Sequence, residues 1–156
     1  MKNLMASDQG GSLMETAVSL GLLMIVIIGI AGGGLMLYTY HYLSYAARLG
    51  SRYAIVRGSA CTGFPSACPA AAADIQSYVQ TLTAVGINPV NLNVTATWCT
   101  SSSSPCTCTV SSGDPLCNNP GDQIRVTVQY PFFLSVPFIP TSQVNMSSSS
   151  QTIISQ

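Results

Sequence analysis

The feature that most constrains the fold is an uncharged apolar segment near the N-terminus. Residues 17–40 have the sequence AVSLGLLMIVIIGIAGGGLMLYTY, and no Asp, Glu, Lys or Arg occurs between Thr16 and Ala47. About 20 apolar residues, at 1.5 Å rise each, cross the hydrocarbon core of a bilayer. A signal peptide would have a basic start and a shorter apolar core. Only Lys2, balanced by Asp8, precedes this segment, so we expect an uncleaved anchor in the lipid bilayer.

The helix is predicted to continue beyond the membrane. Large apolar and aromatic residues recur at steps of three and four, namely Tyr38, Tyr42, Tyr45, Leu49, Tyr53 and Val56. This period is typical of the apolar stripe of an amphipathic helix. One helix over residues 12–57 would be roughly 70 Å long. We therefore expect a stalk that carries a packed domain on this stripe.

Two glycines in the apolar segment form a small-xxx-small pair. Gly29 and Gly33 lie four residues apart, which would let another helix approach closely. The alternative is the ordinary glycine enrichment of membrane helices.

Composition excludes several function classes for the remainder of the chain. The 156 residues leave one modest domain after the helix, and only 6% are charged, against roughly 25% in soluble domains. Because the net charge is zero, the chain has no excess of positive charge that would attract nucleic acid. Asp74, Asp114 and Asp122 are scattered, and His41 lies on the stalk. We expect no enzyme activity and no cofactor.

The C-terminal part is predicted to hold one helix and a few strands. Ile75, Tyr78, Val79, Leu82 and Val85 indicate an amphipathic helix that begins near Ala70 and ends at Gly86. Apolar residues alternate with polar ones over residues 92–98 and again over residues 124–130, which predicts two half-buried strands joined by the loop 100–122.

Prolines are expected to limit the sheet. Pro131, Pro137 and Pro140 argue against continuation of a central strand. A last strand is expected over either residues 143–146 or residues 152–154. The predicted fold class is α+β: a long N-terminal helix packed on a small antiparallel sheet, with the second helix as a flank.

Six cysteines indicate disulfide bonds. Cys61 and Cys68 bracket a tight loop, and we expect them to pair. The other four, Cys99, Cys106, Cys108 and Cys117, lie at or within the long loop, and their pairing stays open among three connectivities. A metal site around Cys106 and Cys108 is the alternative, but zinc-type spacing is usually C-x₂₋₄-C with a second pair. We expect no metal.

Flanking charges and cysteines make opposite predictions of topology. Arg48, Arg52 and Arg57 follow the apolar segment and only Lys2 precedes it, so the positive-inside rule would place the C-terminal domain in the cytosol. An even number of closely spaced cysteines is typical of an oxidising compartment. We give the cysteines more weight and expect the domain outside the cytosol.

Glu15 is a lone acid at the start of the apolar segment. A charge at the centre of a bilayer costs about 2.5–3.5 kcal/mol on insertion scales, so such an acid needs a partner or a role. The sequence DQGG followed by SLMET has the spacing of a type IV prepilin processing site. Cleavage after Gly10 would make Gly11 the new N-terminus and Glu15 the fifth residue. The alternative is an interfacial acid that favours the positive end of a helix.

Two motifs together resemble the TadE/TadG-like pseudopilins of tight-adherence (Flp-type) pili. The stretch GGSLMETAVSLGLLMIVIIGIAGGG is followed by YLSYAARLGSRYAIVRGS. The second motif matches the family at Ala46, Ala47, Arg48, Gly50, Arg52, Tyr53 and Ala54. The family usually has Phe where this chain has Thr16, and a proline that this apolar segment lacks. The resemblance covers about the first third of the chain.

The resemblance implies a minor pilin-like subunit of the inner membrane, cleaved by a prepilin peptidase at the cytosolic face. Its partners would be other pilin-like subunits and the pilus assembly machinery, with its domain in the periplasm or, within a pilus, outside the cell. Glu15 would pair with the Gly11 ammonium of a neighbouring subunit and fix the stagger between subunits.

These expectations divide the chain into three parts. Residues 1–10 form a prepilin-type leader, residues 11–57 the transmembrane and stalk helix, and residues 58–156 a disulfide-stapled domain. One alternative is a single-span membrane protein whose outer domain binds a ligand or partner. Another is a secreted protein released by signal peptidase near Gly33.

Overall fold

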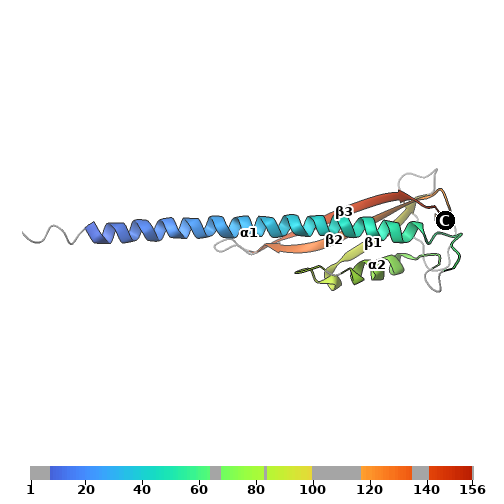
Figure 1. The fold of residues 1–156 in the computed structure, drawn as a ribbon, viewed down its shortest axis with the longest axis horizontal. Coiled ribbons are helices and arrows are strands. Elements are labelled where there is room, and N and C mark those ends of the chain that lie inside the picture. The colour runs from blue at the N-terminus through green and yellow to red at the C-terminus, as the bar shows by residue number, and fades with distance from the viewer. Residues whose placement is uncertain (1–7, 64–67, 83, 100–116, 135–140, 156) are drawn as a thin grey trace, which may run out of the picture.

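The computed structural model describes residues 8–63, 68–82, 84–99, 117–134 and 141–155. Its elements are helix α1 (Asp8–Ile55), helix α2 (Ala72–Thr81), a short 3₁₀ helix η1 (Pro89–Asn91), and strands β1 (Asn93–Cys99), β2 (Gln123–Leu134) and β3 (Ser142–Ile153). The sheet and α2 lie along the C-terminal half of α1 (Figure 1). The predicted α+β fold is confirmed.

Helix α1 is continuous over 48 residues, close to the predicted span. None of the side chains over residues 11–38 is buried. By length and composition this part of α1 is long and apolar enough to cross a membrane. The same helix then enters the core of the domain, beginning at Thr39, which is the first buried residue along the described part of the chain.

The predicted tyrosine stripe of α1 is not the face that packs on the sheet. Tyr38 and Tyr45 are 45% and 58% exposed. The buried face consists mainly of small residues, namely Thr39, Leu43, Ala46, Ala47, Gly50, Ser51 and Ala54. Small side chains let the helix axis come close to the sheet, while the larger Tyr42 and Tyr53 lie half-buried at the edges of the contact.

Gly50 is the point of closest approach. A Cβ atom at Gly50 would lie 3.1 Å from Cγ1 of Val126 in β2 and 3.1 Å from Cγ2 of Val79 in α2. Val79 and Val126 are both fully buried. Three elements therefore meet at a position that has no side chain.

The sheet has the order β1-β2-β3, with both pairs antiparallel. In the first pair Trp98 lies opposite Ile124, which confirms the predicted hairpin of residues 92–98 and 124–130. Even-numbered residues of all three strands face the helices; the buried ones are Val94, Ala96, Trp98, Ile124, Val126, Val128 and Met146. The odd-numbered residues form the opposite, outer face.

Pro131 does not end the central strand, contrary to prediction. β2 continues to Leu134 and pairs with β3 along its whole length. β1, however, pairs with β2 only as far as Asn93 opposite Gln129. Beyond Gln129 the β1 side of β2 is an edge among the described strands, and proline is tolerated at an edge because no donor is needed there.

β3 is one strand of 12 residues that includes the predicted segment 143–146 and all but the last residue of the alternative segment 152–154. The serines over residues 147–150 interrupt the apolar alternation that would have revealed it. Ser148 and Ser150 are the two that face the helix side. The position of Ser150 has a physical reason, because its hydroxyl and that of Ser51 in α1 lie 3.0 Å apart in a hydrogen bond.

α2 is shorter than predicted. It ends at Thr81 rather than at Gly86, and Val85 is 89% exposed. The Tyr42 hydroxyl of α1 donates a hydrogen bond to the carbonyl of Leu82, the residue that follows α2. Gly86 lies in a later turn, where its φ of 79° is accessible to glycine.

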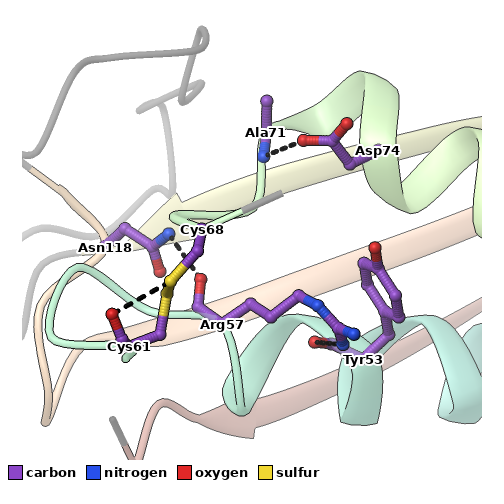
Figure 2. The surroundings of a disulfide bond; sticks show 7 residues. All are labelled: Tyr53, Arg57, Cys61, Cys68, Ala71, Asp74 and Asn118. Carbon is purple, nitrogen blue, oxygen red and sulfur yellow. Dashed lines mark hydrogen bonds between the residues drawn. A yellow bond between two sulfur atoms is a disulfide. The ribbon is translucent and has the colours of Figure 1, made fainter. Parts of the chain in front are cut away.

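The end of α1 is joined to the domain by a disulfide between Cys61 and Cys68, the pair expected from their spacing (Figure 2). The Arg57 carbonyl accepts hydrogen bonds from the Ala70 amide at 2.9 Å and from Asn118 Nδ2 at 3.5 Å. These bonds hold the segment after α1, the segment before α2 and the segment before β2 together.

Aromatic packing reinforces this junction. The rings of Tyr53 in α1 and Tyr78 in α2 are stacked, with centroids 4.4 Å apart. The Arg57 guanidinium carbon lies 3.9 Å from the Tyr53 centroid. Figure 2 shows the Arg57 side chain beside the Tyr53 ring. Asp74 accepts a hydrogen bond from the Ala71 amide at 2.9 Å and so caps the start of α2.

The remaining cysteines are only partly described. Cys99 and Cys117 are buried, and each takes part in a disulfide. Cys106 and Cys108 lie outside the described residues, as does the alternative metal site around them. Among the described residues no cysteine is free, and no group of three or more His, Cys, Asp or Glu could hold a metal ion.

We predict that Gly50→Leu destabilises the domain. A leucine would overfill the contact with Val79 and Val126, which costs roughly 1–3 kcal/mol. Urea unfolding of the full chain in detergent, followed by the fluorescence of the single, buried Trp98, measures the change. Gly33→Leu is the matched control, since no atom lies within 4 Å of a Cβ there. Equal stability of the two variants would contradict the close packing.

We also predict that the native protein has no free thiol. Labelling without reductant should modify no cysteine, whereas Cys61→Ala should expose one thiol on Cys68. Replacing both Cys61 and Cys68 by Ala should lower the free energy of unfolding by about 2–3 kcal/mol, the loop-closure value for a short loop. Stoichiometric labelling of the parent, or bound zinc, would indicate a reducing compartment and contradict the predicted topology.

Candidate functional site

The N-terminal end of α1 holds the residues predicted for processing and assembly. Gly10 and Gly11 lie in the helix, shortly after its first residue, Asp8. Gly11 is exposed, and no atom lies within 4 Å of a Cβ placed there. The Gly10–Gly11 peptide bond therefore lies on a stretch of helix that packs against no other described element.

Glu15 lies on a polar strip of the otherwise apolar helix. Ser12, Glu15, Thr16 and Ser19 follow the spacing of one helix face, and they line a shallow depression together with Leu20 and Leu23. The Thr16 hydroxyl donates to the carbonyls of Ser12 and Leu13, at 3.1 and 3.0 Å. Within the described part of the chain Glu15 forms no salt bridge. Its carboxylate is thus exposed on a surface that otherwise offers only hydroxyls and leucines.

The glycines of the apolar part of α1 leave open surface. No atom lies within 4 Å of a Cβ at Gly21, Gly29, Gly33 or Gly34. Gly29 and Gly33 lie one turn apart on the same side of the helix, where another helix could approach closely.

The C-terminal half of α1 has two distinct sides. Ala46, Ala47 and Ala54 are at most 1% exposed against the sheet. On the opposite side His41, Tyr45, Arg48 and Arg52 are exposed. The alanines and glycine of the second motif therefore make the packing face, and its arginines face solvent. The division was not predicted, although the small residues at steps of three and four are visible in the sequence.

One comparison with known proteins finds a match, and it covers most of α1. A family model described as TadE-like protein matches residues 10–52. No curated protein and no solved structure matches the chain.

The match includes Gly10, Gly11, Glu15 and the whole apolar part of α1, and it ends before the sheet and α2. It supports a pilin-like, Tad pilus-related subunit, and the family is structural rather than enzymatic. One long apolar helix near the N-terminus fits a membrane-anchored, single-pass protein of this kind. The predicted resemblance is confirmed: residues 10–52 match the TadE-like family model.

Proposed function

We propose that this chain is a pilin-like structural subunit for assembly of a tight-adherence pilus, processed after Gly10 and anchored by α1. The observation that carries the proposal is the extent of the TadE-like match. It begins at Gly10 and includes Glu15 and the apolar helix, which are the parts that the proposed mechanism uses.

The start of α1 suits a processing site. Two adjacent glycines weaken a helix, because each costs up to about 1 kcal/mol relative to alanine. Gly11 packs against nothing within the described residues, so opening this turn disturbs no core. A prepilin peptidase at the cytosolic membrane face could therefore bind the segment in an unwound form and cut after Gly10.

The exposure of Glu15 supports a role between subunits. In an isolated subunit the carboxylate lies at the end of the span, where water can reach it. When helices pack side by side, the same carboxylate becomes buried, and the Gly11 ammonium of a neighbour is a matching charge. Breaking a buried ion pair costs about 3–5 kcal/mol, which is enough to disfavour subunits in the wrong register.

The disulfides support a domain outside the cytosol, on the far side of the inner membrane. Cys61–Cys68 and the disulfides of Cys99 and Cys117 belong to a domain with few charges. Such bonds persist in the periplasm and at the cell surface and are rare in the cytosol. The three arginines after the span favour the opposite orientation, and we give more weight to the disulfides.

The two alternatives differ in their mature N-terminus. A single-span protein with an outer binding domain would keep Met1. A secreted protein would start near Gly33, but α1 runs without a break from that region into the buried Thr39–Ala54 face, which supports an anchor that is retained.

We predict that mass spectrometry of the protein from its native host finds Gly11 as the first residue. Gly10→Ala should leave unprocessed precursor in the membrane. Gly33→Ala, which changes a glycine of the same helix far from the site, should be processed like the parent. An intact Met1 in the mature parent protein, or a start after residue 30, would contradict the proposal.

The second test concerns Glu15. Glu15→Ala and Glu15→Gln should insert normally, keep their disulfides and accumulate at the parent level. Co-purification with other pilin-like subunits, and pilus formation, should fall by more than about tenfold, since a buried ion pair is lost. Glu15→Gln is the sharper variant because it keeps shape and hydrogen bonding but removes the charge.

Ser19→Ala is the matched control, because Ser19 lies on the same polar strip one turn further along the helix. It should assemble like the parent. If both Glu15 variants also assemble like the parent, the charge pairing is wrong and Glu15 is only a helix-end residue. If neither variant accumulates, Glu15 serves insertion or folding rather than assembly.

A further inference from the structure

The domain outside the TadE-like match carries a hollow on the outer face of its sheet. The hollow has a volume of about 480 Å³, within the range of small-molecule sites. Six of the residues that line it have amide or hydroxyl side chains: Asn91, Asn93, Gln129, Gln143, Asn145 and Ser147. None of its lining residues is charged.

The strand register explains why these side chains converge. Asn93, Gln129 and Ser147 lie opposite one another across the three strands. Asn145 is next to Ser147 on the same face and lies opposite Pro131. β1 begins at Asn93, so the sheet narrows from three strands to two at this point, and the step leaves the hollow.

The amides of the hollow have unused hydrogen-bonding capacity. Gln143 Nε2 donates to Asn145 Oδ1 at 3.0 Å. The side chains of Asn91, Asn93 and Gln129 form no hydrogen bond with another described residue. At the opposite end of the same face, by contrast, Arg125 donates to Gln151 at 3.1 Å. At the end of the outer face near Arg125 the polar side chains hydrogen-bond to one another. Around the hollow, at the other end, their hydrogen-bonding groups are available to a ligand.

An exposed aromatic ring adjoins the hollow. Phe133 lies on the outer face two residues beyond Pro131, opposite Gln143, and is 63% exposed. Its burial against the core is prevented by the strand alternation, since the neighbouring Phe132 points to the helix side and packs there. A single exposed ring needs no explanation by itself. Phe133, however, lies beside Gln143 and so extends the row of amide side chains in the hollow.

From this arrangement we infer that the outer face around Gln129, Pro131 and Phe133 binds a neutral oligosaccharide. Asn and Gln amides offer a donor and an acceptor side by side, which match adjacent sugar hydroxyls. The C–H groups of a pyranose ring pack on an aromatic face, where the negative charge of the ring is concentrated. The lack of charge in the hollow disfavours anionic polymers and phosphate groups.

The position of the hollow relates it to the cell envelope. β2 runs from the far end of the domain back along α1, so Pro131 and Phe133 lie at the end of the sheet nearer the apolar part of the helix (Figure 1). A polymer bound there would pass close to the membrane-facing end of the domain. The same chemistry could recognise an envelope glycan or a polysaccharide on an external surface.

The test uses the full chain in a detergent without a sugar headgroup. Isothermal titration with chitohexaose, cellohexaose and maltohexaose measures binding. Co-sedimentation with purified peptidoglycan sacculi tests an envelope glycan as the ligand, and co-sedimentation with insoluble cellulose tests an external polysaccharide. We expect binding to at least one hexasaccharide. Phe133→Ala and Gln129→Ala should each weaken it by about fivefold to tenfold, the size of one lost stacking or hydrogen-bonding contact.

Matched controls lie on the same face. Ile153→Ala removes an apolar side chain that is 59% exposed at the opposite end, and Gln151→Ala removes an amide there. Neither should change affinity, and all four variants should keep the parent's disulfides and unfolding midpoint. The inference is overturned if the parent binds no hexasaccharide, or if Ile153→Ala weakens binding as much as Phe133→Ala. It is also overturned if Phe133→Ala leaves sugar binding intact but stops co-purification with pilin-like subunits, because the face would then be a protein interface.

Discussion

The close contact between α1 and the sheet at Gly50 is the constraint on which the rest of the domain depends. A small three-stranded sheet needs a helix to cover one face before it is stable. Here the cover is the upper half of the same helix that carries the apolar segment. Val79 and Val126 reach that helix because Gly50 has no side chain, and the flanking alanines continue the close approach. The core of the domain therefore cannot form apart from the stalk.

This arrangement makes the helix a rigid connection between its two ends. Glu15 and Thr39 are joined by continuous helix, with no linker between the exposed apolar part and the packed part (Figure 1). A shift of one residue along such a helix moves the domain by about 1.5 Å and turns it by about 100°. If Glu15 sets the register between subunits, it also sets which face of each domain is turned outward.

Sequence alone was sufficient where one physical pattern dominated. The apolar segment predicted the exposed part of α1, and strict alternation predicted β1 and the first part of β2. Prediction from the sequence failed where the size of the side chains, rather than their hydrophobicity, decided which face of α1 packs on the sheet. The tyrosines of the stalk are the larger apolar groups, yet the buried face is made of alanine and glycine, because a helix can come close to a sheet only through small side chains.

The missed part of the sheet has a related cause. Serines occupy helix-facing positions of β3, and one of them is satisfied by Ser51 of α1, a contact that no local pattern could reveal. The extension of β2 through Pro131 depends on where β1 begins, which is a property of the sheet and not of the strand. The hollow on the outer face arises from that same step, so it too was invisible before the strands were placed.

The straightness of α1 also limits how the charge of Glu15 can be compensated. The next basic side chains along the helix are His41 and Arg48, about 39 and 50 Å away at 1.5 Å per residue, and neither can reach it. In an apolar surrounding a carboxylate is stable only when water solvates it or when an opposite charge lies beside it. In the proposed function that charge is the Gly11 ammonium, which exists only after cleavage. In an unprocessed subunit the Gly11 nitrogen is a neutral peptide amide, so the proposed partner of Glu15 is missing from a bundle of such subunits. The proposed charge pair would therefore require processing before assembly, independent of any steric effect of residues 1–10.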